Sequence, residues 1–446
     1  MAKYQTYAEY KDSGVEWLGE IPSHWDYFDG KRIFSSVRKQ ALSSDEQLAA
    51  SQKYGVIPQN LMMQLNDSKV MLALKGTESF RHVEKNNFVI SLRSFEGGIE
   101  HSNYEGCVSP AYTVLSSKKN IDYRYFKYLF KSAPFIAALQ STTDSLRDGK
   151  SISYEQFGNI TLPLFSKVEQ NTIANFLDHE TAKIDSLIAK QEKLIELLKE
   201  KRQAVISHAV TKGLDPNVPM KDSGVEWLGE VPEHWIVKSY RLASRIYRGK
   251  FGHRPRNDPA FYDGDYPFIQ TGDVARAGKY ITSYSQTLNE KGKEVSQLFP
   301  KGTLMMAIAA NIGDIAILGF EAYAPDSVVG FKPNNHIDLE FLRYSFIAAL
   351  PALEQTSTQS TQANLNVERI GAVKGTFPSL QEQREIVGYL DNLLEQYRNL
   401  VKIAENAIFL MQERRTALIS AAVTGKIDVR NWQAPSVTEA DTELSA

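Results

Sequence analysis

Two stretches of the chain, residues 169–211 and 382–424, place apolar residues at alternating steps of three and four. This spacing is that of the a and d positions of a heptad repeat, so each stretch is predicted to form a long helix with an apolar seam. Neither stretch contains proline, which would break such a helix. The predicted seam positions are Ile173, Leu177, Ile184, Leu187, Leu194, Leu198 and Val205 in the first helix and Leu390, Leu393, Tyr397, Leu400, Ala404, Ala407, Met411 and Leu418 in the second, with Gln191 and Lys201 as polar interruptions.

Helices of this length need a partner of similar length. About 40 helical residues run about 60 Å, and a small domain cannot bury so long a seam. The two stretches are also copies of each other: EQNTIANFLD at 169–178 is matched by EQREIVGYLD at 382–391, and EKRQAVISHAVT at 200–211 by ERRTALISAAVT at 413–424. We therefore expect the two helices to pair as an antiparallel intramolecular coiled coil.

Two other blocks, Asp26–Ile160 and Ile236–Thr376, have the pattern of strands and turns. Short apolar runs such as NFVISL and TLMMAIAA alternate with Gly, Asn and Asp turns, which predicts strands. Helical patterns follow around Tyr123–Leu139 and Leu339–Leu353. The predicted fold class is therefore α/β, with two globular domains of equivalent architecture and almost no residue-level match between them.

A second repeat introduces each half. KDSGVEWLGEIPSHW at Lys11–Trp25 returns as KDSGVEWLGEVPEHW at Lys221–Trp235, with 13 of 15 positions identical. If the helices pair antiparallel, the first copy can take the place of a missing third copy after the second helix, and the chain closes with a pseudo-two-fold axis. The predicted organisation is a motif at 1–25, a variable domain at 26–160, a helix at 161–212, a linker and second motif at 213–235, a second variable domain at 236–376, a second helix at 377–426 and a tail at 427–446.

Composition narrows the class of protein. The chain has 446 residues, 42% hydrophobic and 23% charged, which is typical of a soluble globular protein. The sequence has no run of about 18 apolar residues, so no transmembrane helix is predicted, and its start lacks the apolar core of a secretory signal. The single cysteine, Cys107, cannot form an internal disulfide, which fits a reducing cytoplasm, and we expect it to be a packed side chain. The net charge is −2, yet Lys and Arg outnumber Asp and Glu in both variable blocks, so the negative balance lies in the repeated parts.

The strongest local signal is a basic segment at Ile236–Asn257 that contains no acidic residue. Such a segment can neutralise phosphates and release counterions, although a solvated charged face would have the same composition. Its aromatic residues are Tyr240, Tyr247 and Phe251, and a weaker counterpart with Lys39 lies in the first block. The predicted phosphate-binding residues are Lys238, Arg241, Arg245, Arg248, Lys250, Arg254 and Arg256, with Lys31, Arg32 and Arg38 in the first block.

Reading bases needs side chains that present paired hydrogen-bond groups to base edges. Arg, Lys, Asn and Gln residues in Gly- or Ser-rich loops beside predicted strands meet this need, and ordinary turn chemistry is the alternative for each. The candidates are Arg93, Arg147, Lys150, Gln270, Asn311, Gln359 and Gln362.

Other chemistry is not indicated. His24 and His234 with Glu16 and Glu226 suggest a metal site only weakly, because a structural site needs about four ligands at defined spacing. The apolar residues of the motif, including Trp17 and Trp25, instead predict a hydrophobic clamp. The sequence contains no GxGxG cofactor loop, no NPPY-like methyltransferase signature and no GxxxxGKS/T phosphate loop, so the chain alone is not expected to be an enzyme.

The repeated DSGVEWLGEIPxHW opening, the paired long helices and the two divergent domains resemble the DNA-specificity subunits of type I restriction-modification enzymes, over essentially the full chain. The resemblance implies that each variable domain reads half of a bipartite asymmetric DNA site. It implies a helix pair that spaces the domains and docks two modification subunits, with restriction subunits as further partners. It also implies no cofactor in this chain, S-adenosylmethionine on the modification subunits and ATP with magnesium on the restriction subunits.

A coiled-coil scaffold with protein-binding variable domains is the alternative from another class. Such a scaffold has no need for a basic segment free of carboxylates at Ile236–Asn257. The charge distribution therefore favours DNA as the ligand of the variable domains.

Overall fold

The structure is a computed structural model that describes residues 4–66, 79–142, 152–253, 257–309, 313–355 and 367–434. The chain forms two compact units, and each combines two separate parts of the sequence. The first unit holds residues 1–191 and 406–446, and the second holds residues 192–405. Both long helices, α7 (Lys167–Lys212) and α13 (Leu380–Val423), therefore contribute one end to each unit.

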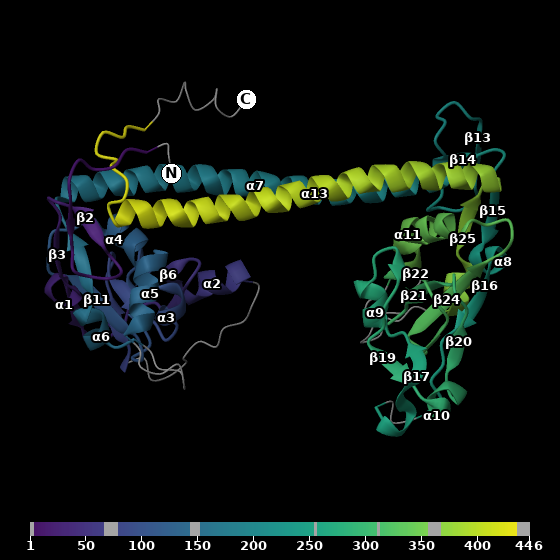
Figure 1. Cartoon of the computed structure of the whole chain (residues 1–446), viewed down its shortest axis with the longest axis horizontal. Coiled ribbons are helices and arrows are strands. Elements are labelled where there is room, and N and C mark those ends of the chain that lie inside the picture. The colour runs from purple at the N-terminus through teal and green to yellow at the C-terminus, as the bar shows by residue number, and fades with distance from the viewer. Residues whose placement is uncertain are drawn as a thin grey trace. The chain divides into compact units, whose positions relative to one another are not determined.

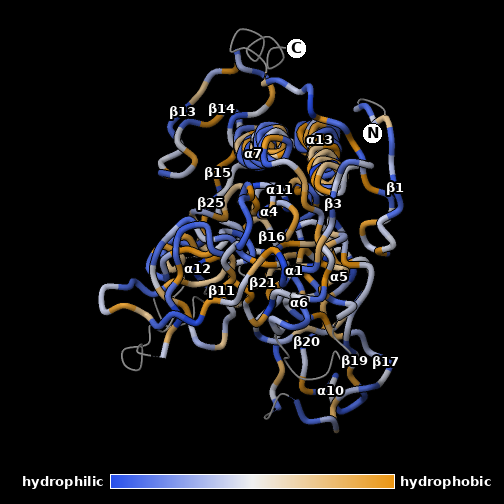
Figure 2. The backbone as a smooth tube through the Cα atoms, turned by 90° about the vertical axis from the view of Figure 1, so that its left-hand side faces the viewer, coloured by the Kyte–Doolittle hydropathy of each residue, from blue (hydrophilic) through white to orange (hydrophobic). Residues whose placement is uncertain are grey.

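The two long helices pair antiparallel, as predicted. In the first unit the beginning of α7 packs against the end of α13, where Ile184 and Leu418 share one core. Arg415 Nε also donates to Asp185 Oδ1 over 2.9 Å there. In the second unit the end of α7 meets the beginning of α13, where Ile206 packs in one core with Leu390. Figure 1 labels both helices, and Figure 2 shows them side by side.

The predicted seam is correct at the helix ends and wrong at several positions between them. Leu187, Leu194 and Leu400 were placed on the seam, but their side chains are 37%, 42% and 46% exposed. Ile188 and Ile195, one residue later along α7, are the half-buried positions instead. Each of these leucines has an apolar neighbour in sequence, so steps of three and four fit either choice.

A four-stranded antiparallel sheet is the centre of the first domain. Helix α4 (Tyr123–Phe130) packs on it, and its Phe126 and Phe130 contact Phe34 of the first strand. The strands, in spatial order, are β4 (Phe34–Val37), β11 (Thr113–Ser117), β8 (Phe88–Ile90) and β9 (Glu100–His101). Around them lie the pairs β1 (Tyr10–Asp12) with β2 (Glu20–Pro22), β3 (Asp26–Asp29) with β12 (Thr161–Leu164), β5 (Leu48–Ser51) with β6 (Gly55–Pro58) and β7 (Arg81–Val83) with β10 (Gly106–Val108), and the helices α1 (Gly30–Ile33), α2 (Gln59–Asn66), α3 (Ser94–Gly97) and α6 (Tyr154–Asn159).

The helical pattern predicted around Tyr123–Leu139 corresponds to two helices. The structure has α4 (Tyr123–Phe130) and α5 (Ala133–Ser141), separated at Lys131 and Ser132. Pro134 lies in the first turn of α5, a position that proline favours because its missing N–H has no helical acceptor there. The same proline would remove a hydrogen bond from the interior of one continuous helix, which explains the break.

Two sheets form the second domain. The larger has the order β16 (Ser244–Arg248), β24 (Val328–Pro333), β21 (Leu304–Ala307), β22 (Ile315–Leu318) and β18 (Tyr280–Ile281). The smaller has the order β19 (Gln286–Leu288), β17 (Tyr262–Phe268), β23 (Ala322–Ala324) and β20 (Gln297–Phe299). The remaining elements are β13 (Met220–Asp222) with β14 (Glu230–Pro232), β15 (Ile236–Ser239) with β25 (Lys374–Phe377), α8 (Tyr240–Ala243), a 3-10 turn at Pro259–Phe261, α9 (Thr271–Arg276), α10 (Glu290–Glu294), α11 (Leu339–Gln355) and α12 (Val367–Ala372).

The two domains share one plan. In each, a strand pairs with the strand that precedes the long helix, as β3 does with β12 and β15 with β25. A four-residue helix, α1 or α8, then leads into an edge strand, β4 or β16, that pairs antiparallel with a strand far along the domain. The smaller sheet of β17, β19, β20 and β23 has no four-stranded equivalent in the described part of the first domain. The prediction of equivalent α/β domains with divergent sequences is confirmed at this level.

Each copy of the repeated motif is held by the first turn of a long helix. Trp25 is fully buried, and its indole nitrogen donates to Glu169 Oε1 over 3.0 Å, while His24 Nε2 lies 2.9 Å from Glu169 Oε2. The second copy repeats this arrangement with Trp235, His234 and Glu382 at 2.9 and 3.1 Å. The predicted hydrophobic clamp is confirmed.

Each motif copy also contacts the end of the other long helix within its unit. Gly425, just after α13, has a φ of 73°, and a Cβ there would lie 2.4 Å from Cδ of Pro22 in the first copy. Gly213, just after α7, has a φ of 81° and lies against Trp235 of the second copy. In the first unit Lys426 Nζ donates to Glu20 O over 2.6 Å, and Asp428 N to Gln5 O over 2.8 Å. The first motif thus occupies the end of α13, as expected for a chain that closes on itself.

Repeated polar residues attach each domain to its long helix. Tyr128 OH donates to Asp178 Oδ1 over 2.8 Å in the first unit, and Tyr344 OH donates to Asp391 Oδ1 over 2.6 Å in the second. Asp178 and Asp391 are equivalent positions of the repeated helix sequence. Lys279 adds an ion pair to Asp391 at 2.8 Å. Each domain is therefore attached to its long helix through the equivalent aspartate of the helix repeat.

Within the described part of the chain, no helix combines the length and apolar character that a bilayer span requires.

Candidate nucleic-acid interface

The basic segment of the second domain forms β15, α8 and β16. Arg245, Arg248 and Lys250 are exposed along and just after β16, an edge strand of the larger sheet. Arg245 also lies 5.2 Å from the ring of Tyr247. Exposed at this edge, the three side chains are placed to contact a phosphate backbone.

Two other basic residues of this segment have structural contacts. Lys238 lies 5.0 Å from the ring of Phe377, and burial lowers the pKa of its ammonium group. Arg241 donates from Nε to Gly371 O over 3.3 Å and from a terminal nitrogen to Glu368 O over 3.2 Å, which fixes α8 to α12. These contacts give both residues a role in the fold that the sequence did not indicate.

The aromatic residues of the basic segment are mostly part of the core. Tyr240 is fully buried, its ring is stacked on Phe346 at 4.0 Å, and its hydroxyl lies 2.8 Å from Ser345 Oγ. Phe251 is 3% exposed and contacts Phe268 at 5.5 Å. Neither ring is available to stack on a base.

Among the base-reading candidates predicted for the second domain, Gln270 lies within the described residues. It lies at the N-cap of α9, and its backbone N–H donates to Asp273 Oδ2 over 2.9 Å. Its side-chain Nε2 donates to Oε1 of Gln286 on β19. Gln286 was not among the predicted residues, because its proximity to Gln270 comes from the pairing of β17 with β19 and no local motif marks it.

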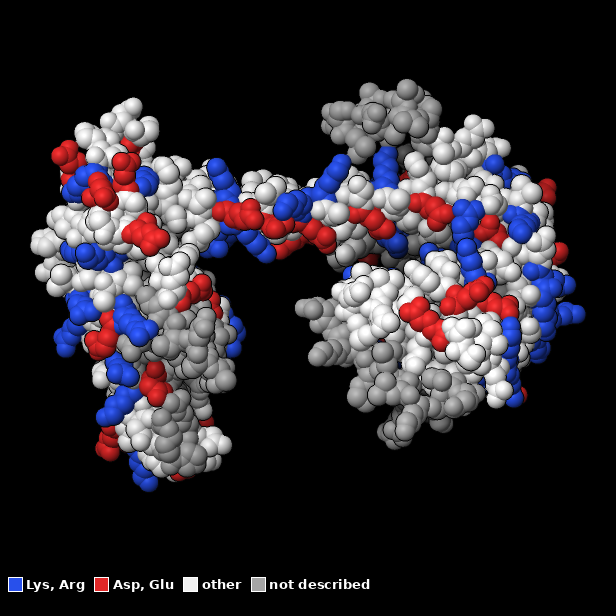
Figure 3. All heavy atoms as spheres, turned by 180° about the vertical axis from the view of Figure 1, so that it is seen from behind, with Lys and Arg blue, Asp and Glu red and all other residues white. Residues whose placement is uncertain are grey.

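The basic candidates of the first domain are spread over two places. Lys31 and Arg32 lie exposed on α1, where Lys31 Nζ donates to Asn159 over 2.9 Å and Arg32 lies 5.6 Å from the ring of Phe28. Arg38 and Lys39 follow β4, and Lys39 Nζ lies 3.1 Å from Glu84. On the face seen in Figure 3, basic side chains gather along one margin of this domain.

Arg81 is a basic residue that the sequence analysis missed. Burial lowers the pKa of its guanidinium, and the like charge of Arg38 lowers it further. Gln40 forms a β-bridge with Arg81, and His82 N donates to Lys39 O over 2.9 Å, so Arg81 lies beside the segment that carries Arg38. Two neighbouring guanidinium groups make this pair a candidate phosphate contact. Arg93, by contrast, is an N-cap residue whose Nε donates to Glu96 Oε2 over 2.8 Å.

Seven of the predicted site residues lie outside the described residues: Arg147, Lys150, Arg254, Arg256, Asn311, Gln359 and Gln362.

Burial shifts the pKa values of two neighbouring residues on β9 of the first domain. Burial raises the pKa of Glu100 to about 7, although Lys131 lies against Oε1 at 2.5 Å, and burial lowers the pKa of His101 to about 4. Both residues lie on β9 against the core, and the described residues contain no group of three or more His, Cys, Asp or Glu that could hold a metal ion. Because both side chains lie in the core, these shifts make the stability of the domain depend on pH.

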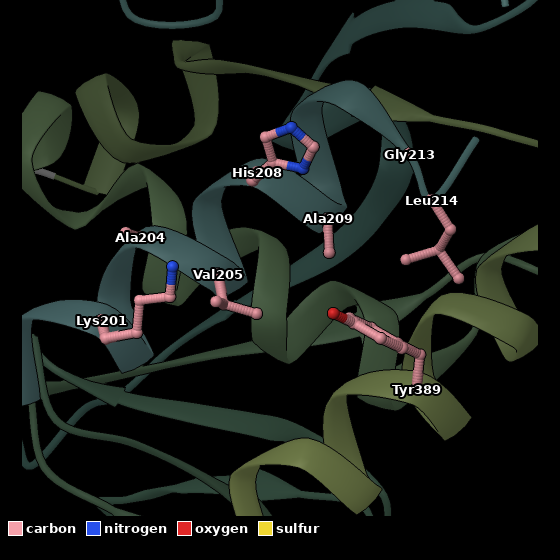
Figure 4. Close-up of a pocket in the computed structure, with 8 residues that line it drawn as sticks. All are labelled: Lys201, Ala204, Val205, His208, Ala209, Gly213, Leu214 and Tyr389. Atoms are coloured by element: carbon pink, nitrogen blue, oxygen red, sulfur yellow. The ribbon is translucent and has the colours of Figure 1, made fainter. Parts of the chain in front are cut away.

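A groove of about 400 Å³ lies on the helix pair in the second unit. Figure 4 shows Tyr389 of α13 and Leu214 pointing into it beside Val205 and Ala209 of α7. Its lining is a mixture of apolar and polar side chains, with Lys201 and His208 at its margin.

Comparisons with known proteins agree with this arrangement. The chain matches the family described as type I restriction modification DNA specificity domain twice, over residues 22–197 and 252–407. It is 23% identical over 345 residues to the type I restriction enzyme EcoBI specificity subunit of Escherichia coli, covering 72% of this chain and 69% of that one. It is 27% identical over 186 residues to the MjaIX specificity subunit of Methanocaldococcus jannaschii, covering 40% of this chain and 43% of that relative.

The fold is also similar to that of a chain in a solved structure that concerns the complex assembly and conformational transition of the type I R-M system. That chain is 12% identical, with a TM-score of 0.67 over 90% of this chain and 98% of its own length. With two copies of the family's domain over most of its length, the chain belongs to the type I restriction-modification DNA specificity subunits, the non-catalytic DNA-recognition members of those systems.

Proposed function

We propose that this chain directs a type I restriction-modification complex to a bipartite, asymmetric DNA site, with one half-site read by each variable domain. The observation that carries the proposal is the double family match, in which each copy spans most of one divergent domain and much of its long helix. Domains with one plan and different sequences are suited to bind two different half-sites. A pair of half-sites related by such domains is not palindromic.

The proposed DNA contacts divide into two kinds. Exposed basic residues, such as Arg245, Arg248 and Lys250 in the second domain and Arg38 in the first, bind phosphates and give affinity without sequence preference. Amide side chains, represented by Gln270, read base edges and give specificity. The predicted residues that lie outside the described ranges stay candidates for both roles.

The helix pair is the proposed docking surface for two modification subunits. Large apolar side chains are exposed on α13 in both units: Leu400 and Ile403 in the second, and Phe409 and Leu410 in the first, with Ile403 at 66% exposure. A contact of this kind explains apolar surface that the fold leaves uncovered. The modification subunits would then bind S-adenosylmethionine, and the restriction subunits would bind ATP with magnesium. This chain would bind no cofactor.

Point substitutions test this docking better than truncation. A truncation from Glu413 onward would also remove Leu418 and Ala422 from the core of the first domain. Ile403→Asp and Phe409→Asp instead change exposed side chains, and each should reduce the modification subunit that co-purifies. Gln412→Asp, at an exposed polar position of α13, is the matched control. Full co-purification with both substituted chains would contradict the docking surface.

The experiment that tests the recognition function is a methylome. The chain is co-expressed with a cognate modification subunit in methylation-free cells, and genomic DNA is sequenced for N6-methyladenine. A split asymmetric motif with one methylated adenine on each strand is the expected result. A co-purifying complex that adds no methylation and selects no DNA sequence would favour a protein-binding scaffold instead.

A further inference from the structure

Gln270 and Gln286 stand between two hollows on the surface of the second domain. One hollow has a volume of about 280 Å³ and is lined by both glutamines with Phe251 and Phe268. The other has a volume of about 370 Å³ and is lined by both glutamines with Asp263, Tyr284 and neighbouring residues of β19. Because both amides line both hollows, the pair forms a polar ridge with space on either side.

The backbone on both sides of this ridge is fixed by one buried carboxylate. Asp273 is 5% exposed, and its Oδ2 accepts the backbone N–H of Gln270 over 2.9 Å. Its Oδ1 accepts the hydroxyl of Ser285, the residue before Gln286, over 2.8 Å. Gln286 itself lies opposite Phe268 in the pairing of β19 with β17. The two glutamines are thus held on regular elements by a shared anchor, as a preorganised binding site requires.

The described lining of the ridge offers neutral amide groups rather than positive charge. No Lys or Arg is among the described residues that line either hollow, and Asp263 adds a negative charge to one of them. The donors and acceptors available are those of two primary amides. The hydrogen bond between Gln270 Nε2 and Gln286 Oε1 uses one N–H and one oxygen lone pair. The two amides therefore still have other N–H groups that can donate and other lone pairs that can accept.

The edge of a base with one donor and one acceptor matches this set. In the major groove adenine presents an N6 amino donor and an N7 acceptor, which a glutamine amide can bind together. Guanine presents two acceptors at the same place, O6 and N7, and the carboxylate of Asp263 and the amide oxygens would face them unfavourably. Adenine is therefore the purine that the ridge can bind best.

We propose that the Gln270–Gln286 pair reads the major-groove edge of an adenine in the half-site bound by the second domain. This inference rests on the proposed recognition function and adds the residues and the base. The hydrogen bond between the two amides limits their rotation. A base other than adenine would therefore leave an amide donor or acceptor without a partner.

The test uses the complex of the full chain with its modification subunits. Gln286→Ala and Gln286→Met, which keeps the length of the side chain without its amide, are each assayed for binding to a randomised site library. Loss of a base contact is worth about 1–3 kcal/mol, so both variants should relax one A·T position by roughly 5- to 150-fold and leave the other positions unchanged. Gln297→Ala on β20, at the opposite edge of the same sheet, is the matched control.

DNA that carries 7-deazaadenine separates base reading from a structural effect. At the adenine in question, loss of the N7 acceptor should weaken binding by the native chain and leave binding by Gln286→Ala unchanged. If the native complex selects a motif that neither Gln286 variant alters, or if 7-deazaadenine weakens both chains equally, the inference is wrong and the recognition function stands. If the native complex selects no motif, the recognition function fails first.

Discussion

The indole nitrogen of Trp25 lies 3.0 Å from Glu169 Oε1, and this hydrogen bond joins the repeated motif to the first turn of α7. The same bond joins Trp235 to Glu382 on α13. Both partners of the bond recur in the sequence, the tryptophan in the motif and the glutamate in the helix repeat. The two repeats are thus the two sides of one contact, which explains why they recur together.

The two copies of this contact should differ in their effect on stability. Glu169 is buried and accepts from Tyr7 OH over 2.8 Å as well as from Trp25, whereas Glu382 is 28% exposed and has no tyrosine donor among the described residues. Glu169→Ala leaves two buried donors without an acceptor and should cost about 2–4 kcal/mol. Glu382→Ala should cost about 1 kcal/mol.

Hydrogen exchange resolved along the chain measures both effects, because the first turn of α7 and the first turn of α13 belong to different units. Glu169→Gln serves as a control that keeps one acceptor oxygen. Equal loss of protection in the two alanine variants would show that the extra contact of Tyr7 adds nothing.

The helix seam gives a second matched comparison. Ile184 is 4% exposed within the core of the first unit, and Leu187, three residues later, is 37% exposed. Ile184→Ala should lower the free energy of unfolding by about 2–4 kcal/mol, while Leu187→Ala should lower it by less than about 1 kcal/mol. Chemical denaturation of the whole chain measures both. Equal costs would mean that Leu187 lies on the seam beside Ile184, as the heptad read from the sequence predicted.

The position of Leu187 also shows what the sequence could and could not predict. Absence of proline and a period near 3.5 were enough for two long helices and their antiparallel pairing. The choice between Leu187 and Ile188 was not determined, because both are apolar and the partner surface decides which one is covered. The α4–α5 break required the first-turn preference of Pro134, a signal that was present and not used.

The sequence predicted the kind of residue that forms the candidate site, but not which individual side chains are free to bind DNA. Clusters of Lys and Arg identified the segment at β16, but Arg241 and Lys238 proved to contact the fold itself. Gln286 and Arg81 become candidates only through strand pairing and proximity to residues distant in sequence. Such tertiary proximity leaves no periodic trace in a single sequence.

Glu100 predicts a pH dependence for the first domain. Burial raises its pKa to about 7 from 4.5, so the folded domain holds a proton that the unfolded chain releases above pH 4.5. The stability that this group contributes is fully present below pH 4.5 and is lost as the pH rises through 7. Each pKa unit corresponds to about 1.4 kcal/mol, so ionisation should cost the native domain on the order of 3 kcal/mol that Glu100→Gln does not lose.

His101 titrates in the opposite sense and lower in the range. Its pKa falls to about 4 in the folded domain, so its contribution is lost as the pH falls below 6.5. Thermal unfolding of the native chain and of Glu100→Gln between pH 4.5 and 8 measures the Glu100 contribution, because His101 is present in both chains and cancels in the difference. Glu105→Gln, at an exposed position nearby in sequence, is the control and should follow the native profile. A constant difference between native and Glu100→Gln across this range would contradict the raised pKa.

Lys250 tests the division of the DNA interface into phosphate and base contacts. Its side chain is exposed at the end of the basic segment, and a single phosphate contact contributes about 0.9 to the slope of log K against log salt. Lys250→Ala should therefore reduce that slope by about one and weaken binding equally for every DNA sequence. Lys193→Ala is the matched control, because that lysine lies on α7 and pairs with Glu196 at 2.8 Å. Fluorescence anisotropy of the complex from 50 to about 300 mM salt measures both slopes. A variant that keeps the native slope but changes the preferred bases would make Lys250 a reader of sequence and would remove it from the phosphate contacts.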